Sequence, residues 1–499
     1  MTAITYTPTL EEAKGLAGQG NVVPVFREIL ADLETPVSAY LKVARGRYSF
    51  LLESVEGGER LARYSFIGTE PYRVLRTGTN VTANEQPGDP LVHIEDELRR
   101  FQPVRVEGLP RFHGGAVGYM SYEVARYYEP RLPMPDADPQ GFPESIFLFT
   151  DTLLVFDHLQ HKIKVVAHAR LDGDVEASYR QATWKIEELV ARLAKPLAGL
   201  PYDPSGAGET AGGAVESNMT REEFMGKVER AKEYIVRGDT YQIQVSQRFS
   251  RRTGAHPFEV YRALRMVNPS PYMYYLDLGD MHVVGASPEM LVRIEDGVIE
   301  THPIAGTRRR GRDAEDEQRM AEELQTSEKE RAEHIMLVDL ARNDLGRVCE
   351  AGSVKVTSLM AIERYSHVMH MVSHVVGKLR GDVSTYDALR AYFPHGTVTG
   401  APKIRTMEII AELEGERRGG YGGCIGYFDM SGNCDSALAI RTIWMKPGVA
   451  YAQAAGGVVY DSTPEEEYLE SGNKARALLR AIELAEERSA GAPRGSLGY

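Results

Sequence analysis

The sequence predicts a mixed α/β or α+β fold, because strand-like apolar runs alternate with long amphipathic helices on both sides of one Gly/Pro-rich linker. The chain has 499 residues, more than a single hydrophobic core usually supports, so we expect two domains or one large two-lobed domain. Apolar residues make up 42% of the chain and charged residues 26%, the proportions of an ordinary globular protein. The pattern leaves the order of the strands open.

Helix and strand signals alternate in the region before the linker. Two segments carry apolar side chains three and four positions apart, the spacing of an amphipathic helix; they are residues 91–101 and 177–193. Shorter apolar runs predict strands at residues 37–43, 49–52, 146–156 and 163–169. The third of these runs is interrupted by polar residues at 150–152.

The linker, PLAGLPYDPSGAGETAGG at residues 196–213, is rich in Gly and Pro and lacks apolar periodicity. It gives the clearest change of composition along the chain. We therefore expect an N-terminal region at residues 1–195, a linker at 196–217, a second domain at 218–490 and a tail at 491–499.

After the linker, Thr220 and Glu223 form a capping-box pattern that opens a helix through Arg237, with Gly238 as its C-terminal cap. A strand is expected at residues 241–249, a hairpin-like strand region at 281–294, and one long charged helix at 313–341. Near the end we expect three successive strands, at 419–428, 436–445 and 449–454, and a helix at 465–486 that Pro464 begins.

Net charge narrows the classes of partner. The 58 Lys+Arg and 71 Asp+Glu residues give a formal net charge of −13, which argues against broad electrostatic binding to nucleic acid or to an anionic membrane. An anionic substrate would need positive charge placed at its own site. Three cysteines are too few for a disulfide framework. We see no secretory signal and no apolar stretch long enough to span a membrane, so we expect a cytoplasmic protein.

Four glutamates form the sharpest group of candidate metal ligands. Glu330 and Glu333 lie three positions apart in one expected helix, and Glu467 and Glu470 lie three apart in another. Because residues at i and i+3 share a helix face, two such helices facing each other would offer an oxygen-rich site that suits Mg²⁺. Such pairs on Glu-rich helices are more often solvated surface, and the spacing alone favours that interpretation.

Other segments carry candidate anion-binding or proton-transfer groups. Gly306 and Thr307, followed by three arginines, could hold a carboxylate or form a turn, and the two interpretations are even. Residues 454–457 (AAGG) could present backbone N–H groups to an anion or form a tight turn. Arg441, inside an apolar strand, needs a carboxylate partner. His370 reads as a core histidine or as a proton-transfer group.

In combination, these segments resemble the chorismate-utilising enzyme family. The resemblance rests on motifs that occur in the family's order: PIAGTRRRG, EHIMLVDLARNDLGRV, RYSHVMH, FPHGTVTGAPKIRTMEII, GGYGGCIGYF, AIRT and ESGNKARALLRAI. The segments LLES, RYSFIG, GGAVGYMSYE and NPSPYMYY are similar to those of anthranilate synthase large subunits, one branch of this family. The resemblance implies an α+β chorismate-binding fold, with two stacked β-sheets flanked by helices, in which both halves of the chain share the sandwich.

The resemblance also implies roles for residues of the second domain, which would bind chorismate and carry out catalysis. The cofactor would be Mg²⁺, bridging the protein to the ring carboxylate of chorismate and held by Glu330, Glu333, Glu467 and Glu470. Contacts to chorismate would come from Gly306, Thr307, Tyr421, Arg441, Ala455, Gly456, Gly457 and Lys474. The family often has Gly-Ala-Gly where this chain has Ala455-Gly456-Gly457.

Two positions separate the branches of the family. Enzymes that add water to chorismate carry a lysine where this chain has Gln242, and aminodeoxychorismate synthases commonly carry a nucleophilic lysine where it has Ala305. Ammonia needs less activation than water, so the resemblance implies attack of ammonia at ring C2, loss of pyruvate, and anthranilate as the product. By the same resemblance, Glu289 is the general acid for the departing C4 hydroxyl, and His370 serves the pyruvate-eliminating step.

The family implies two further partners. Glutamine amidotransferases carry a nucleophilic cysteine in a Gly-x-Cys-x-Gly segment, and we expect none of the cysteines here to lie in such a segment or to serve that role. Ammonia would then come from a separate glutaminase subunit in a hetero-oligomer. L-Tryptophan would act as a feedback inhibitor, bound by Glu53, Ser54, Arg63, Pro271, Tyr272 and Met273, although LLES could equally be an ordinary strand end.

Two alternatives stay open. One is the large subunit of an aminodeoxychorismate synthase, against which Ala305 argues. The other is a non-catalytic tryptophan sensor on the same scaffold, which would need neither the four glutamates nor Glu289 and His370.

Overall fold

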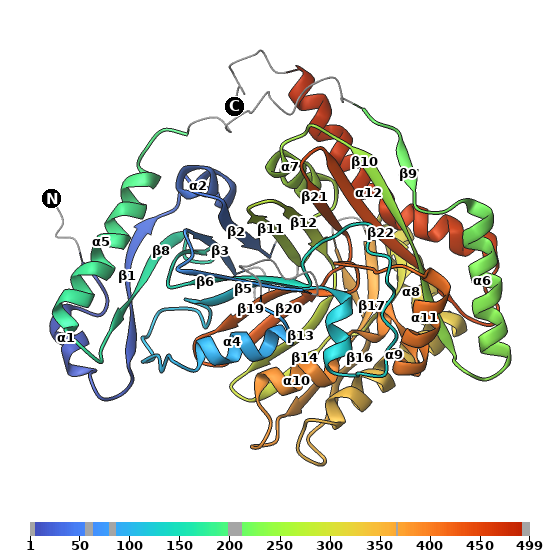
Figure 1. Ribbon diagram of the computed structural model, residues 1–499, viewed down its shortest axis with the longest axis horizontal. Coiled ribbons are helices and arrows are strands. Elements are labelled where there is room, and N and C mark those ends of the chain that lie inside the picture. The colour runs from blue at the N-terminus through green and yellow to red at the C-terminus, as the bar shows by residue number, and fades with distance from the viewer. Residues whose placement is uncertain (1–4, 55–62, 79–85, 198–211, 366–367, 492–499) are drawn as a thin grey trace.

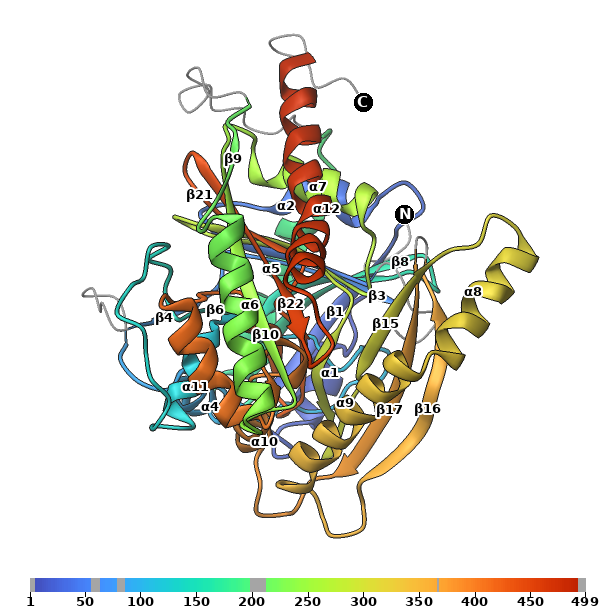
Figure 2. The same cartoon turned by 90° about the vertical axis from the view of Figure 1, so that its right-hand side faces the viewer.

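The computed structural model describes residues 5–54, 63–78, 86–197, 212–365 and 368–491. Within these residues two large antiparallel sheets stack face to face, and helices cover the outer face of each (Figures 1 and 2). The expected α+β sandwich is confirmed. Because all strands within the sheets pair antiparallel, the α/β interpretation with parallel strands is wrong.

The first sheet has 12 strands in the described residues, and the two halves of the chain meet between β2 and β11. Along the sheet the strands are β1 (Val22–Leu30), β8 (Lys162–Arg170), β7 (Thr152–Asp157), β3 (Tyr64–Thr69), β2 (Tyr48–Glu53), β11 (Tyr272–Leu278), β12 (His282–Ser287), β21 (Thr442–Lys446), β22 (Val449–Val458), β10 (Gln242–Arg252) and β18 (Gly400–Ala401), with β9 (Val215–Ser217) paired to β10.

The second sheet has 10 strands in the described residues, and here the halves meet between β19 and β5. Its strands are β15 (Ile304–Arg309), β17 (Val368–Lys378), β14 (Val298–Thr301), β13 (Met290–Glu295), β20 (Cys434–Leu438), β19 (Cys424–Asp429), β5 (Gly115–Met120), β6 (Ser145–Thr150) and β4 (Arg73–Thr77), with β16 (Lys355–Arg364) paired to β17. Both sheets therefore contain strands from both halves of the chain, as expected.

Helices complete a four-layer arrangement. The outer face of the first sheet packs against α1 (Leu10–Gly15), α2 (Pro36–Val43), α5 (Val175–Leu193), α7 (Pro257–Val267) and α12 (Pro464–Gly491). The outer face of the second sheet packs against α4 (Pro90–Leu98), α9 (Glu328–Gly346), α10 (Thr385–Tyr392), the 3₁₀ helices η1 (Tyr122–Tyr127) and η3 (Gly396–Val398), and part of α11 (Lys403–Glu414). Aromatic residues such as Phe50, Tyr119, Tyr274 and Trp444 fill the space between the sheets.

The remaining helices lie near the sheet ends. α6 (Arg221–Val236) packs with α11 on β10 and β22, and α8 (Ala314–Thr326) packs on the ribbon of β15, β16 and β17. No helix in the described part of the chain combines the length and the apolar character that a membrane crossing needs.

Three apolar runs each cross from one sheet to the other. Residues 146–156 form β6 in the second sheet and β7 in the first, with Asp151 between them. Residues 281–294 form β12 and β13, also in different sheets, so the predicted hairpin is wrong. Residues 436–445 form β20 and β21 in the same way. Since the strands on either side of each crossing are largely buried, hydrophobicity gives no sign of the change of sheet.

Two other predictions are wrong for identifiable reasons. Residues 37–43, predicted as a strand from their valines, form helix α2, whose buried side chains lie three and four apart and whose capping box joins Thr35 and Ser38. The long helix predicted at 313–341 is two helices, because Ser327 ends α8 and caps the start of α9. The extended backbone of Ser327 breaks a helical pattern that is otherwise continuous.

The other predicted elements are present, with shifted ends. Gly238 has the left-handed φ of +82° expected after a helix C-terminus, and the strand predicted at 419–428 begins at Cys424. The end of the predicted linker forms β9 at Val215–Ser217. Residues 198–211 of that linker and residues 492–499 of the predicted tail lie outside the described residues. The domain boundaries themselves stay a prediction.

Candidate active site

The predicted catalytic residues converge where β10 and β22 of the first sheet meet β15 and β17 of the second, with α9 and α12 alongside. Figure 2 shows this side of the molecule, with α12, β10, α9 and β15 facing the viewer. The site is built from segments more than 200 residues apart in sequence, and the antiparallel pairing of β10 with β22 brings Gln244 opposite Gly457.

Glu333 lies at the centre of the glutamate group. Its Oε1 accepts a hydrogen bond of 3.0 Å from Gln242 Nε2. Burial raises the pKa of Glu333, and the negative charges of Glu330 and Glu470 raise this pKa further. Carboxylates from α9 and α12 therefore lie close enough to affect one another. Glu333 is half-buried and Glu470 is exposed, so the role of the group as a metal site stays a prediction.

Glu467 is 5% exposed and lies against the backbone of Gly456. Its Oε1 accepts a 2.7 Å hydrogen bond from Ser462, whereas its Oε2 is buried and has no hydrogen-bond partner among the described residues. A Cβ at Gly456 would lie only 2.5 Å from Oε2, so this close approach requires glycine. The AAGG segment is part of strand β22 and is not a turn.

The other two glutamates are paired with cations. Lys474 Nζ lies 2.6 Å from Glu470 Oε1 and donates a 2.9 Å hydrogen bond to the Ala455 carbonyl. Arg308 Nη1 lies 3.0 Å from Glu330 Oε1. Among the described residues no three His, Cys, Asp or Glu side chains are close enough to hold a metal ion. The carboxylate donors and the orphaned oxygen of Glu467 nevertheless fit a hard cation such as Mg²⁺.

Gly306 and Thr307 lie at a bulge in the pairing of β15 with β17, directly against His370. Gly306 has a φ of +69°, which favours glycine. His370 Nδ1 is 3.1 Å from both the Gly306 carbonyl and the Thr307 hydroxyl. Because a carbonyl only accepts, Nδ1 carries the proton and Nε2 is the basic nitrogen. Burial lowers the pKa of His370, which keeps the ring neutral.

Arg441 reaches the same region from the connection between β20 and β21. Its backbone has a left-handed φ of +51°, and its guanidinium donates to the Lys474 carbonyl. Burial lowers the pKa of Arg441, while the nearby Tyr421 and Glu470 raise it. Tyr421 is buried, its hydroxyl is hydrogen-bonded to the Ala455 backbone, and burial raises its pKa to about 12. Among the described residues the Arg441 guanidinium has no carboxylate as a hydrogen-bond partner, so it is suited to an anionic ligand.

Glu289 lies at the crossing between β12 and β13. It is 5% exposed, and burial raises the pKa of its carboxyl to about 8. The Thr397 hydroxyl lies 3.1 Å from its Oε1, and His395 Nδ1 lies 3.5 Å from the same oxygen. Sequence analysis missed Thr397 and His395 as functional residues, although both occur in the quoted FPHGTVTGAPK motif. The carboxyl is protonated at neutral pH, as a general acid must be.

The two positions that separate the family branches are both neutral and both lie in the site. Gln242 contacts Glu333, and Ala305 is buried immediately before Gly306. No lysine amine is present at either position. Lys474 is the lysine that the structure does bring to this region, and its amine is held by Glu470 and the Ala455 carbonyl.

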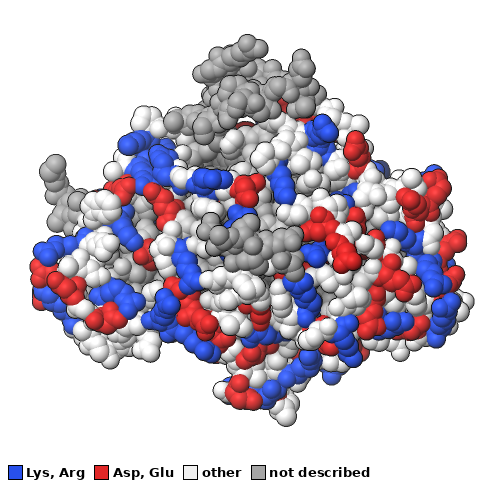
Figure 3. All heavy atoms as spheres, viewed as in Figure 1, with Lys and Arg blue, Asp and Glu red and all other residues white. Residues whose placement is uncertain are grey.

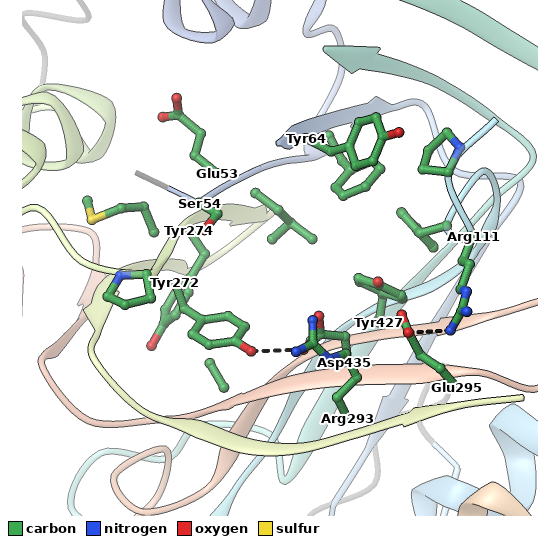
Figure 4. A pocket seen from close by; sticks show the side chains of 18 of the residues that line it. Glu53, Ser54, Tyr64, Arg111, Tyr272, Tyr274, Arg293, Glu295, Tyr427 and Asp435 are labelled. Carbon is green, nitrogen blue, oxygen red and sulfur yellow. Dashed lines mark hydrogen bonds and ion pairs between the residues drawn. The ribbon is translucent and has the colours of Figure 1, made fainter. Parts of the chain in front are cut away.

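The candidate tryptophan residues border a separate cavity of 1020 Å³ between the two sheets (Figure 4). This volume is at the upper end of the range of about 300–1,000 Å³ for small-molecule pockets. Glu53 and Ser54 line it from the end of β2, and Pro271, Tyr272 and Met273 line it from the start of β11. The Tyr272 hydroxyl donates to Asp435 Oδ1 at 3.1 Å across its floor.

Two of the candidates have partners of their own. Glu53 accepts hydrogen bonds from Tyr261 and from Arg265, with the Arg265 Nε at 3.2 Å, so its charge is already matched. Arg63 does not line the cavity and pairs with Asp157, with Nη2 and Oδ2 3.0 Å apart. The structure therefore brings together five of the six predicted residues.

Residues 422–426 (GGCIG) match the letters of the amidotransferase pattern, so the expectation that none of the cysteines lies in such a segment is wrong for Cys424. Its thiol is buried at the start of β19, and burial raises its pKa to about 12. A thiol with a raised pKa is inert as a nucleophile. The expectation that no cysteine serves as a glutaminase nucleophile thus has a physical basis at this position.

The sequence model of the chorismate binding enzyme family matches residues 47–480. The chain belongs to this family. Anthranilate synthase component 1 of Acetivibrio thermocellus is 47% identical over 496 residues, covering 97% of this chain and 99% of that protein. The solved structure of anthranilate synthase component I from Streptococcus pneumoniae TIGR4 superposes with a TM-score of 0.74 at 36% identity, covering 90% of this chain and 98% of its own.

The family's fold is also shared at much lower identity. The menaquinone-specific isochorismate synthase of Escherichia coli superposes with a TM-score of 0.68 at 19% identity, covering 96% of this chain and 99% of its own. The two-sheet fold is therefore shared with a protein of a different name, and the reaction has to be argued from the side chains in the site.

Proposed function

We propose that this chain is the large subunit of an anthranilate synthase, which converts chorismate and ammonia to anthranilate and pyruvate in tryptophan biosynthesis. The observation that carries the proposal is the pair of neutral residues, Gln242 and Ala305, in a site whose other groups fit the family's chemistry. Neither a lysine base for water nor a lysine nucleophile is available there, so a neutral amine nucleophile is the reaction partner that the site accommodates. Near-full-length relatives named anthranilate synthase component 1 support it.

Chorismate would bind as a dicarboxylate across the two sheets. Arg441, with the Tyr421 hydroxyl and the backbone of 455–457, would receive the enolpyruvyl carboxylate, because a guanidinium, a hydroxyl and backbone N–H groups are donors that suit an anion. Glu330, Glu333, Glu467 and Glu470 would hold Mg²⁺. When bound, that ion would supply positive charge for the ring carboxylate.

Proton transfers fall to two residues of the chain. Glu289, kept protonated by burial, would give its proton to the departing C4 hydroxyl, which leaves as water while ammonia adds at C2. His370 is neutral and its basic nitrogen is Nε2. This nitrogen would take the C2 proton of the amino intermediate while the enolpyruvyl group leaves and becomes pyruvate. Gly306 and Thr307 would orient this imidazole through its Nδ1–H.

The ammonia would come from a separate glutaminase subunit, so the working enzyme would be a hetero-oligomer. The name of the relatives, component 1, supports a partner. Tryptophan would bind in the cavity between the sheets as a feedback inhibitor. The apolar and aromatic lining from β2 and β11 suits an indole, and the charged groups at the opposite wall suit an amino acid's polar end.

The test uses the full-length purified chain with chorismate, Mg²⁺ and ammonium salt at mildly alkaline pH. Anthranilate fluorescence should rise with ammonium, and glutamine should not replace ammonium in the absence of a partner. Formation of 4-amino-4-deoxychorismate would assign the chain to aminodeoxychorismate synthases. Failure of folded protein to consume chorismate, together with tryptophan binding, would make it a sensor.

A further inference from the structure

The candidate acid Glu289 and two side chains behind it, Thr397 and His395, form a short series of hydrogen-bonding groups. Glu289 Oε1 lies 3.1 Å from Thr397 Oγ1, and Thr397 Oγ1 lies 2.6 Å from His395 Nδ1. The backbone N–H of Thr397 donates to the same Nδ1 at 3.1 Å. Glu289 and His395 are both buried, at 5% and 4% exposed. All three groups belong to the region where η3 meets the crossing between β12 and β13.

The direction of each hydrogen bond follows from a count of protons. Because Nδ1 accepts from the Thr397 backbone, the neutral His395 ring carries its proton on Nε2. Burial lowers the pKa of His395 to about 3, so the ring stays neutral. The Thr397 hydroxyl has one proton and two possible acceptors, His395 Nδ1 and Glu289 Oε1. It donates to Nδ1 when Glu289 is protonated and to Oε1 when Glu289 is ionised.

We propose that His395 is a positioning residue for the general acid and acts through Thr397. By accepting the hydroxyl proton of Thr397, His395 keeps that donor away from Glu289 Oε1. The protonated carboxyl is thereby favoured, and its own proton stays available to the substrate. This inference rests on the proposed function, because it assumes that Glu289 protonates a leaving hydroxyl.

His395 stays neutral throughout one turnover. The C4–O bond of the substrate breaks, the departing hydroxyl takes the Glu289 proton, and water leaves. The Thr397 hydroxyl then rotates its proton from His395 Nδ1 to the new carboxylate, which stabilises the ionised form at that moment. When Glu289 takes up a proton for the next turnover, the Thr397 proton returns to Nδ1. His395 accepts a hydrogen bond in one state and releases it in the other, and no proton is transferred to it.

Two charged side chains near Glu289, Thr397 and His395 affect the pKa values of the acid and of the histidine. The ammonium of Lys474 lowers the pKa of Glu289, opposing the effect of burial. The ammonium of Lys403 lowers the pKa of His395, in addition to burial. Lys403 itself is paired with Asp344 at 2.7 Å, and the ring of Tyr392 lies 5.4 Å from that of His395. Among the described residues, the carboxylate near the His395 ring is that of Glu289, whose Oε1 lies 3.5 Å from Nδ1.

The test is the pH profile of kcat for the full-length chain, at a fixed concentration of free ammonia so that ammonium titration does not enter. The basic limb of this profile is the fall of kcat at alkaline pH, where Glu289 loses its proton. In H395F the Thr397 hydroxyl can donate only to the carboxylate, so the pH of this fall should decrease by about one unit. In T397V that donor is gone, so the basic limb should move up while kcat falls. H395N places an amide oxygen near Nδ1 and should restore the wild-type limb.

The double variant H395F/T397V separates positioning from a structural role. If His395 acts only through Thr397, its basic limb should coincide with that of T397V. Shifts of H395F and T397V in the same direction, no shift in H395F, or a further shift in the double variant would overturn the proposal. Should H395F fail to fold, H395L serves in its place, because its side chain has no atom that accepts a hydrogen bond. A wild-type chain that makes no anthranilate would refute the proposed function before any variant is compared.

Discussion

At the scale of single residues, two buried glutamates take different tasks because their neighbours differ. Glu289 has a hydroxyl as its nearest partner and no cation at hydrogen-bond distance in the described residues, so burial raises its pKa to about 8. Glu333 shares its surroundings with Glu330 and Glu470, and the mutual repulsion of these carboxylates is what a bound cation would relieve. The first environment suits an acid and the second suits a ligand.

Replacement of Glu289 by Gln should abolish the acid function with little change in shape. Because a carboxamide cannot supply the proton, we expect kcat to fall by about 10²–10⁴-fold. In the wild type, kcat should fall as the pH rises through about 8, since the protonated carboxyl is lost above its pKa. Steady-state fluorescence of anthranilate across pH 6–10, as a rough range around that pKa, measures both effects.

The control is Glu222→Gln, on the exposed first turn of α6, which removes one carboxylate away from the site. Its kcat and pH profile should match the wild type. A Glu289→Gln enzyme that retains full activity, with its basic limb unmoved, would show that another group protonates the leaving hydroxyl.

Replacement of His370 by Ala should affect the second half-reaction more than the first. The substitution removes the Nε2 that would take the C2 proton, while Glu289 keeps its own hydrogen-bond partner. We expect chorismate to be consumed and an amino intermediate to accumulate, with anthranilate and pyruvate formed at least about tenfold more slowly. Chromatography of a quenched reaction separates the species. Undiminished anthranilate release would show that this histidine has no part in pyruvate elimination.

At the scale of elements, the positions of Glu289 and Arg441 explain which part of the site the sequence predicts. Both lie in crossings between the two sheets, after β12 and after β20. Motif resemblance identifies these residues, but apolar periodicity reads 281–294 as a hairpin and 436–445 as one strand. The change of sheet is a tertiary property: hydrogen bonds such as Leu438 N–H to the Glu289 carbonyl, at 3.0 Å, hold the two crossings together across 148 residues of intervening sequence.

Other features also separate into local patterns, which the sequence predicts, and contacts between distant residues, which it does not. The α12 pair of Glu467 and Glu470 and the capping box at Thr220 are local patterns, so spacing and capping chemistry predict them. The partnership of Thr397 with Glu289 is not local, and neither residue type is rare in loops. In residues 36–43 the two signals conflict: the valines favour a strand, whereas buried side chains three and four positions apart are typical of a helix.

The bulge of β15 offers a test of how tightly α9 is placed. A Cβ at Gly306 would lie 2.6 Å from Leu324 Cδ1 and 2.9 Å from Glu330 Oε2, in a backbone with φ of +69°. Gly306→Ala should therefore displace Glu330 as well as strain the chain. We expect kcat/KM to fall at least about tenfold, with about 1 kcal/mol of lost stability from the positive φ.

Gly297→Ala is the matched control for this substitution. Gly297 also has a positive φ, +76°, but a Cβ there meets nothing within 4 Å. Gly297→Ala should lose only the stability that its positive φ costs, and Gly306→Ala should lose more in thermal melts because of its contact with Leu324. Gly297→Ala should keep kcat/KM within about twofold of the wild type. Equal activity losses in both would mean that backbone strain, and not the position of Glu330, limits the reaction.

At the scale of the whole molecule, the net charge of −13 is compatible with a dicarboxylate substrate because charge is distributed locally. Acidic and basic side chains are interspersed over the face shown in Figure 3, so this face does not present charge of one sign. The site itself contains the cationic side chains of Arg441 and Lys474, both half-buried. Composition therefore excludes classes of large partner, whereas the site decides the small ones.

The sandwich also connects the cavity between the sheets to the catalytic strands. Glu363 and His374 line the cavity, from β16 and β17, and Glu363 pairs in register with His370. The Tyr365 ring, which also lines the cavity, lies 5.6 Å from the His370 ring. A ligand that moves this wall would therefore act on the strand that carries the proposed base.

This connection predicts that tryptophan inhibits catalysis and stabilises the fold, and that Ser54→Phe removes both effects. The phenyl group would occupy the cavity at the end of β2, where tryptophan is proposed to bind. At a hundred times its Kd, tryptophan should stabilise the wild type by about 2.7 kcal/mol, seen as a higher Tm, and should lower anthranilate formation. Because coupling requires a differential contact of the ligand, the Ser54→Phe enzyme should form anthranilate in tryptophan's presence with an unchanged Tm. Inhibition that persists in this variant would place the inhibitor elsewhere.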